Sequence, residues 1–402
     1  MIESLAAKSL SLYQALDQIL SAGFQFGGSF ALWRKPQSTE LEISFDDAKE
    51  AKKISLSLED APAGFIIHPF EDQEDQMAYF IEAKEYFKIS ISEDQDSIQL
   101  PNWVQRLEAP TDKKYFFQKL DIDFISEIKS NRDGSSKVDF LNLVEKSIAS
   151  ISEGYLEKVV PARTKKLPIP SDFDLAKSLL SLLKSYPNSF VNFFHLPGIG
   201  TWMGASPEIL IETKGDWFYT MSLAGTQSAK GENPLKAAAW TQKEIEEQAL
   251  VSRYIVDCFK KIRLREYEEH GPKTVLAGNL LHLRSDFRVN MKETNFPQLG
   301  SVMLQLLHPT SAVCGMPRKP AHDFLKSYEG FDRKFFAGFI GPVNIENQTS
   351  IFVNLRTASF SKDQITLYAG AGVTEDSNPE MEWEETEMKC EIIGKFIQNP
   401  QL

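Results

Sequence analysis

The feature that most constrains this chain is a series of short strand-like segments that do not alternate regularly with helices. Helical periodicity is confined to isolated stretches at 140–151, 172–184, 236–262, 320–328 and 380–397. Strand-like runs recur from end to end: FQFGGSFALW, AGFIIHPF, MAYFIEA, YFKISIS, EKVVPAR, SFVNFFHL, ILIETKGDWFYTMSL, KTVLAGNLL, FAGFIGPVNI, SIFVNLRTASF and QITLYAGAG. Hairpin-like spacing with isolated helices predicts an antiparallel α+β architecture rather than repeated βαβ units.

The chain divides into two parts that differ in content. Up to about residue 110, acidic connections such as EDQEDQ and SEDQDS join the strands, and no pattern there indicates chemistry. A polar break, SNRDGSSK at 130–137, precedes a predicted helix with apolar residues at the helical period: Phe140, Leu143, Val144, Ile148 and Ile151. The patterns that indicate chemistry follow this break.

Composition and charge exclude several classes of function. Lys and Arg total 44 against 56 Asp and Glu, a net charge of −12, whereas nucleic-acid binders usually present a basic surface. The first twenty residues lack the basic and apolar regions of a signal peptide, and no run of eighteen apolar residues occurs. We therefore expect a cytoplasmic protein with no nucleic-acid or membrane partner. The odd, widely spaced set Cys258, Cys314 and Cys390 predicts buried, reduced thiols.

The stretch 380–397 places charged residues on its apolar side. On a helical wheel Glu384, Glu387 and Glu391 share the solvated face. The opposite face carries Glu382, Glu385 and Lys389, flanked by Met381, Met388, Ile392, Trp383 and Cys390. A charge removed from water must be paired or must bind a metal, so the inward acids are candidates for either role.

The helix predicted at 236–262 repeats this pattern. Glu247 lies in the middle of an apolar stripe formed by Trp240, Leu250, Val251, Tyr254 and Cys258. Two inward carboxylates on separate helices, without His or Cys at ligand spacing, suit a hard cation with oxygen ligands such as magnesium. The other interpretation, a buried salt bridge to Lys389 or Lys243, stays open at this stage.

Nine motifs occur in an order that resembles the chorismate-utilising enzymes: EKVVPAR, GASPEIL, LAGT, KEIEEQALV, HPTSAVCGMP, EGFDRKFFAGFIGPV, NLRTA, YAGAGV and EWEETEMK. That family includes isochorismate, salicylate, anthranilate and aminodeoxychorismate synthases, and the resemblance covers roughly residues 140–398. It implies a single domain over 1–402, with a variable half at 1–110 and a catalytic half at 140–398. The implied fold is a large antiparallel β-sandwich with outer helices.

The resemblance also implies roles for the inward acids. Glu247 and Glu385 match magnesium ligands, with Glu382 beside them or bridging through water. The Mg²⁺ would engage the ring carboxylate of chorismate and neutralise part of a dianion.

Further family positions match substrate-binding residues. Arg356 and Lys389 match carboxylate-binding positions, and Thr226 and Gly370 would offer a hydroxyl and backbone N–H groups. Ala312 and Val313 would line the ring pocket. His282 would contact the C4 hydroxyl or help to set Glu208, whereas His308 is more often structural.

The implied chemistry needs a base and an acid on opposite sides of the ring. Lys158 matches the lysine that activates water for attack at C2 of chorismate, and Glu208 matches the acid that protonates the departing C4 hydroxyl. The resemblance therefore implies an isomerase, an isochorismate synthase that feeds menaquinone or siderophore biosynthesis. A monomer is the family's common form, and no amidotransferase partner is expected.

Three other functions remain as alternatives. A salicylate synthase uses the same residues and then eliminates pyruvate. An anthranilate or aminodeoxychorismate synthase uses ammonia, and Lys158 speaks against it because that position is typically glutamine there. A binding protein without activity would not need the acid and base. The chain also departs from the family at Gln248, often histidine, and at QSAKG, where an arginine-rich stretch is common.

Overall fold

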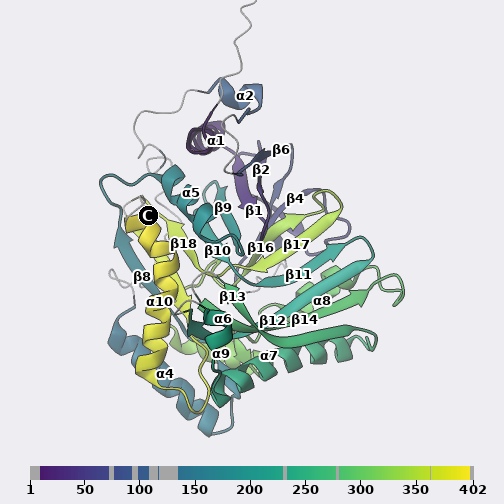
Figure 1. The fold of residues 1–402 in the computed structure, drawn as a ribbon, viewed down its shortest axis with the longest axis vertical. Coiled ribbons are helices and arrows are strands. Elements are labelled where there is room, and N and C mark those ends of the chain that lie inside the picture. Colours follow the sequence, from purple (N-terminus) through teal and green to yellow (C-terminus); the bar gives the residue numbers. More distant parts are fainter. Residues whose placement is uncertain are drawn as a thin grey trace, which may run out of the picture.

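Two antiparallel sheets form the centre of the computed structural model, which describes residues 10–71, 77–92, 98–107, 116, 135–229, 233–277, 280–362 and 364–398 (Figure 1). The first sheet has the strand order β6-β2-β1-β9-β10-β18-β19-β8. Its strands are β1 (Ser29–Arg34), β2 (Glu40–Asp46), β6 (Glu85–Ser90), β8 (Ala162–Pro168), β9 (Phe190–Leu196), β10 (Gly200–Ser206), β18 (Thr357–Phe360) and β19 (Gln364–Gly370).

The second sheet has the order β13-β14-β12-β11-β17-β16-β4-β5-β3. Its strands are β3 (Lys52–Ser55), β4 (Gly64–His68), β5 (Met77–Glu82), β11 (Ile209–Lys214), β12 (Trp217–Ser228), β13 (Glu268–Ala277), β14 (Leu280–Asn290), β16 (Phe339–Val343) and β17 (Gln348–Val353). A short pair, β7 (Lys158–Val159) with β15 (Gly315–Met316), stands apart. Strands from the first ninety residues belong to both sheets, and the prediction of one domain over 1–402 stays a prediction.

Aromatic side chains fill the space between the sheets. Phe190 of the first sheet stacks on Phe352 of the second at 4.0 Å between ring centroids, and Trp33 lies 5.1 Å from Phe65. Side chains alternate along a strand, so residues three positions apart on β1 face opposite sides of the sheet. Trp33 faces the core between the sheets, and Phe30 faces a second core on the other side of the first sheet. The two cores confirm the predicted α+β class with a sandwich of antiparallel sheets.

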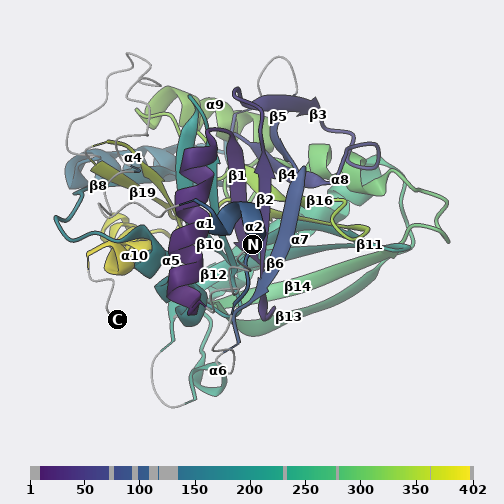
Figure 2. The same cartoon turned by 90° about the horizontal axis from the view of Figure 1, so that it is seen from above.

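Helices cover the outer faces. Figure 2 shows α1 (Leu12–Phe26) and α5 (Leu175–Ser185) side by side against the first sheet, with α10 (Pro379–Gln398) next to α5. On the second sheet, α7 (Gln242–Lys261) packs on β12 and β14, and α8 (Leu299–Leu307) packs on β11. The other helices within the described residues are α2 (Asn102–Gln105), α4 (Lys137–Ser152), α6 (Pro234–Ala237) and α9 (Arg318–Tyr328).

Several sequence predictions need correction. The helix predicted at 236–262 is broken into α6 and α7, because Thr241 and Glu244 form a capping box that starts a new helix. Trp240 therefore lies outside the helix. On α10 the predicted flanking residues Met381 and Met388 are exposed, since the buried stripe runs instead through Glu382, Thr386, Cys390 and Ile393.

Other predictions are confirmed or concern residues outside the ranges that the structure describes. The helix at 140–151 forms as α4, with Phe140, Leu143 and Val144 buried. All three cysteines are buried and unpaired. Within the described ranges no helix is both long and apolar enough to cross a membrane. The polar break at 130–137 and the two acidic connections lie largely outside the described residues.

Arg163 on β8 fastens α10 to the first sheet. The side chain is almost fully buried, its Nε donates to Thr386 Oγ1 at 2.6 Å, and its guanidinium lies 3.8 Å from the centre of the Trp383 ring. It also forms an ion pair with Glu387, which the sequence placed on the solvated face. Lys165 reaches the same carboxylate at 2.7 Å from a more exposed position.

We predict that Arg163→Met lowers the free energy of unfolding by about 2 kcal/mol or more, because it leaves Glu387 without its buried partner and removes the cation–π contact. Urea unfolding measures the change. The control Lys165→Met removes a partly exposed ion pair to the same carboxylate and should cost less than about 1 kcal/mol. Equal losses for the two variants would contradict the assigned role of Arg163.

Candidate active site

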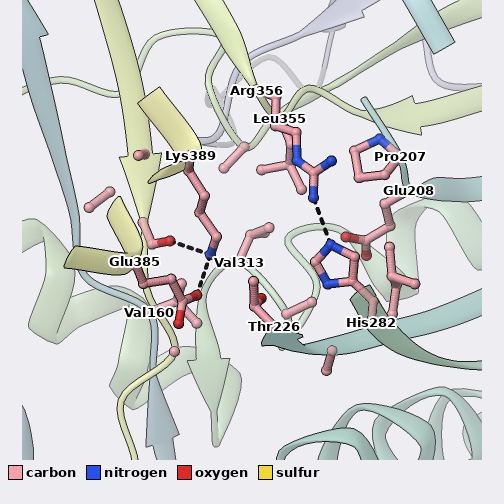
Figure 3. A pocket seen from close by; sticks show the side chains of 18 of the residues that line it. Val160, Pro207, Glu208, Thr226, His282, Val313, Leu355, Arg356, Glu385 and Lys389 are labelled. Atoms are coloured by element: carbon pink, nitrogen blue, oxygen red, sulfur yellow. Dashed lines mark hydrogen bonds and ion pairs between the residues drawn. The ribbon is translucent and has the colours of Figure 1, made fainter. Parts of the chain in front are cut away.

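A pocket lies where strands of both sheets meet α7 and α10 (Figure 3). Its lining contains most of the residues singled out by the sequence: Glu208, Thr226, Glu247, His282, Ala312, Val313, Arg356, Gly370, Glu385 and Lys389. Residues separated by up to 181 positions, from Glu208 to Lys389, are thus brought to one cavity. Lys158 and Glu382 are absent from this lining: Lys158 contacts it through an ion pair with Glu247, whereas Glu382 pairs with Lys243, which is also outside the lining.

Each of the three inward glutamates is paired with a lysine. Lys158 Nζ on β7 donates to Glu247 Oε1 at 2.8 Å, and its side chain is fully buried. Lys243 Nζ lies 2.5 Å from Glu382 Oε1. On α10 itself, Lys389 Nζ lies 2.7 Å from Glu385 Oε1 and also donates to the Gly370 carbonyl at 2.7 Å (Figure 3).

These pairs bear on the two interpretations left open by the sequence. The salt bridges to Lys243 and Lys389 are present, for Glu382 and Glu385 respectively, and Glu247 pairs with Lys158, a contact that was not predicted. Among the residues that the structure describes, no three His, Cys, Asp or Glu side chains are grouped closely enough to hold a metal ion.

The donor set nevertheless fits a hard cation. Carboxylate oxygens are the ligands that magnesium prefers. Glu382 Oε2 is buried without a hydrogen-bond partner, so one ligand atom is uncommitted. A Cβ at Gly372 would lie 2.3 Å from Glu247 Oε1, so the glycine leaves room for this carboxylate at the pocket wall. A cation would have to displace lysine partners to use all three glutamates.

The charges act on each other strongly. Burial would raise the pKa of Glu247, but the charge and hydrogen bond of Lys158 outweigh it and lower that pKa. For Glu382, burial and the nearby charge of Glu385 raise the pKa against the opposing effect of Lys243. Burial would lower the pKa of Lys243, yet the negative charges of Glu382, Glu385 and Glu247 raise it. Lys243 is therefore within electrostatic reach of all three acids.

The pKa of Glu208 is shifted in the opposite direction to that of Glu247. Glu208 follows Pro207 at the crossing from β10 to β11, with 4% of its surface exposed. Burial raises its pKa to about 8, and the positive charges of Lys158, Arg356 and Lys389 offset this only in part. The carboxyl group facing the pocket is thus protonated at neutral pH, as a general acid requires.

A bulge in β12 places Gly225 in contact with both Glu247 and His282. The register of β12 against β14 shifts between Ala224 and Gln227, where Gly225 has φ of +71°. The Gly225 N–H donates to Glu247 Oε2 at 3.3 Å, and its carbonyl lies 2.7 Å from His282 Nδ1. The LAGT motif therefore places one glycine between two functional side chains.

His282 holds Arg356 in the pocket. A carbonyl oxygen can only accept, so Nδ1 of His282 carries the proton that it donates to Gly225. Its Nε2 then accepts from the Arg356 guanidinium at 2.7 Å (Figure 3). Burial and the charge of Arg356 lower the pKa of His282 well below its usual value. His282 is therefore a neutral acceptor that orients Arg356, and its expected roles at the C4 hydroxyl or at Glu208 stay predictions.

Sequence reasoning missed several residues of the pocket wall, and Arg333 is the charged one among them. Arg333, in EGFDRKFF, is buried and donates to the Val160 carbonyl at 2.7 Å and the Val313 carbonyl at 2.8 Å. It forms an ion pair with Glu329 at 2.6 Å. The spacing of four residues between Glu329 and Arg333 could have predicted their ion pair. It could not have predicted that Arg333 lines the pocket.

Two positions noted in the sequence have structural contacts. Gln248, where the family often has histidine, is buried and its Nε2 donates to Ser222 Oγ at 2.8 Å and Ser285 Oγ at 3.3 Å, which fixes α7 against β12 and β14. His308 lies edge-on to His68, at 5.1 Å between rings, behind the pocket rather than in its lining.

Comparison with known proteins identifies the family. Residues 38–398 match the model of the chorismate binding enzymes, so the chain belongs to that family, and the match begins well before the 140–398 region predicted from motifs.

Similar proteins include two isochorismate synthases from Escherichia coli. MenF is 27% identical over 266 residues, covering 65% of this chain and 61% of MenF. EntC is 28% identical over 261 residues, covering 63% of this chain and 66% of EntC. The matched segments thus span less than two thirds of these relatives.

Solved structures share the fold. The menaquinone-specific isochorismate synthase MenF of E. coli superposes with a TM-score of 0.71 at 21% identity, covering 96% of this chain and 91% of that one. Anthranilate synthase component I of Streptococcus pneumoniae gives 0.64 at 17% identity, covering 98% and 94%.

The pKa of Glu208 predicts a specific dependence of stability on pH. Since the native pKa is about 8 and the ordinary value is 4.5, the unfolded chain releases this proton first as pH rises. This group's contribution to stability therefore falls between these two values, by about 1.4 kcal/mol for each unit of difference. We expect Glu208→Gln to gain stability relative to wild type as pH increases from 5 to 8.

Denaturant unfolding at pH 5, 6.5, 8 and 9 measures this difference. Glu384→Gln, at an exposed position on α10, is the control and should show little pH dependence relative to wild type. A constant difference between Glu208→Gln and wild type would mean that Glu208 is ionised across the range.

Proposed function

We propose that the protein is an isochorismate synthase, an isomerase that adds water at C2 of chorismate with loss of the C4 hydroxyl. The observation that carries the proposal is the buried Glu208 carboxyl, whose pKa burial raises to about 8, in a pocket that also contains the cations Arg356 and Lys389. The family and the activities named for MenF and EntC support it.

The substrate is held by local positive charge. Chorismate is a dianion, and the chain has a net charge of −12, so binding depends on Arg356 and Lys389 within the pocket. Arginine is suited to a carboxylate because its planar group offers two parallel hydrogen bonds. Thr226 and the backbone at Gly370 add polar contacts, and Ala312 with Val313 forms the apolar wall for the ring.

The reaction divides between a base and an acid. Lys158 takes a proton from a water molecule, whose oxygen forms a bond to C2. The ring double bonds shift, the bond from C4 to its oxygen breaks, and Glu208 donates its proton so that the hydroxyl leaves as water. One water enters and one leaves, so substrate and product are isomers. In the structure the Lys158 ammonium donates to Glu247. This hydrogen bond must open and the ammonium must give up a proton before the free amine can accept one from water.

Glu247 and Glu385 would hold the magnesium ion, with Glu382 beside them. Bound there, the ion would neutralise the ring carboxylate of the substrate. The fit depends on the uncommitted Glu382 Oε2 and on exchange of lysine partners at the carboxylates.

An aminating function, as in the similar anthranilate synthase component I, is the second candidate because that fold is shared. Lys158 favours water as the nucleophile, since water needs a base whereas free ammonia does not. We therefore propose no amidotransferase partner. Menaquinone biosynthesis is the pathway we favour for the product, as in the menaquinone-specific relative.

We predict that purified protein with chorismate and MgCl₂ makes isochorismate without ammonium salts and without releasing pyruvate, as judged by chromatography. Lys158→Ala and Glu208→Gln should each reduce kcat by roughly 10²-fold or more, because each removes one proton transfer. Chorismate binding should change less than turnover.

The matched control is Lys165→Ala, a partly exposed lysine that pairs with Glu387 rather than with a glutamate of the pocket lining. It should keep near-normal kcat. Pyruvate release would favour the salicylate synthase alternative, and an amino-chorismate formed only with ammonia would favour the aminating one. Normal kcat in both active-site variants would refute the assigned acid and base.

A further inference from the structure

Lys243 lies between the two helices that carry the inward glutamates. It stands one turn before Glu247 on α7, so the two side chains share a helix face. Its ammonium crosses to α10 and lies 2.5 Å from Glu382 Oε1. The Glu382 side chain is 1% exposed, and its second oxygen has no hydrogen-bond partner. Among the described residues, Lys243 is thus the cation that pairs with the deeply buried Glu382 carboxylate.

The position of Lys243 differs from that of the other two lysines. Lys158 is fully buried on β7, and Lys389 is also held by the Gly370 carbonyl. Lys243 reaches the acids from the solvent side, with 26% of its side chain exposed, and the charges of Glu247, Glu382 and Glu385 all act on it. Its flexible four-carbon stem allows it to leave without moving the backbone.

Carboxylates gathered in a buried site need positive charge nearby. We propose that Lys243 is a built-in counter-ion: it neutralises the glutamates while no divalent cation is bound, and it must leave Glu382 when the cation binds. The metal and the ammonium compete for the same negative charge, so Lys243 stabilises the metal-free protein and weakens metal binding. This inference rests on the magnesium site of the proposed function.

The competing role makes the opposite prediction. If Lys243 instead orients Glu382 as a ligand, its removal would weaken magnesium binding. The sign of the change in affinity therefore separates a counter-ion from an orienting group, and no turnover measurement is needed.

The experiment titrates metal-free wild type and Lys243→Met with MgCl₂ by calorimetry and records thermal unfolding with and without the metal. We expect the variant to have a lower Tm without metal, a Mg²⁺ dissociation constant at least tenfold lower than wild type, and a larger rise in Tm on adding MgCl₂. Lys243→Gln, which keeps a hydrogen-bond donor without the charge, replaces it if the Met variant does not fold.

The control is Lys137→Met. Lys137 on α4 forms an exposed ion pair, at 2.7 Å, with Glu380 of α10. This variant therefore changes the net charge equally but leaves the pocket intact. It should bind Mg²⁺ like wild type. Binding by the Lys243 variant that is unchanged or weaker would overturn the inference while leaving the proposed metal site standing. If neither wild type nor the variants bind Mg²⁺, both the metal site and the counter-ion role are wrong.

Discussion

The arrangement of the pocket depends on three buried or partly buried ion pairs between glutamates and lysines. They connect β7, α7 and α10: Lys158 with Glu247, Lys243 with Glu382, and Lys389 with Glu385. Buried pairs of this kind contribute little net stability, because the loss of hydration offsets much of the attraction. The grouping of three such pairs beside one cavity therefore points to function. Arg163 and Gln248 keep the two helices in place for these contacts.

Two buried glutamates in the same pocket illustrate how neighbours decide protonation. Glu247 accepts a hydrogen bond from an ammonium, which lowers its pKa and keeps it ionised. For Glu208, burial raises the pKa to about 8, and the nearby charges of Lys158, Arg356 and Lys389 offset this only in part. One carboxylate is thus prepared to bind positive charge and the other to donate a proton. Opposite shifts in neighbouring titratable groups are a common basis for acid and base roles.

Part of this arrangement could be predicted from the sequence. Antiparallel sheets followed from strand spacing, and the inward position of Glu247, Glu382 and Glu385 followed from helical periodicity. Residue-by-residue likeness to family motifs found ten members of the pocket lining. The roles of these residues stay proposals, since position alone does not establish them.

Other parts could not be predicted because they depend on contacts distant in sequence. The pairing of Lys158 with Glu247 spans 89 positions, and that of Arg356 with His282 spans 74. Local signals were also overlooked. The capping box of Ser11 with Gln14 marked the start of α1, which we did not predict. The exposed Met381 and Met388 on α10 show that apolar character alone does not decide which face of a helix is buried.

The central claim is that this pocket activates water for attack on the substrate ring while the C4 hydroxyl leaves. Turnover of chorismate in water enriched in ¹⁸O, followed by mass spectrometry of the product, tests this claim most directly. The account predicts isochorismate that carries one ¹⁸O atom, located at the C2 hydroxyl. Isochorismate without ¹⁸O would show that the hydroxyl moves within the molecule, and it would contradict the assignment of Lys158 and Glu208 to separate proton transfers.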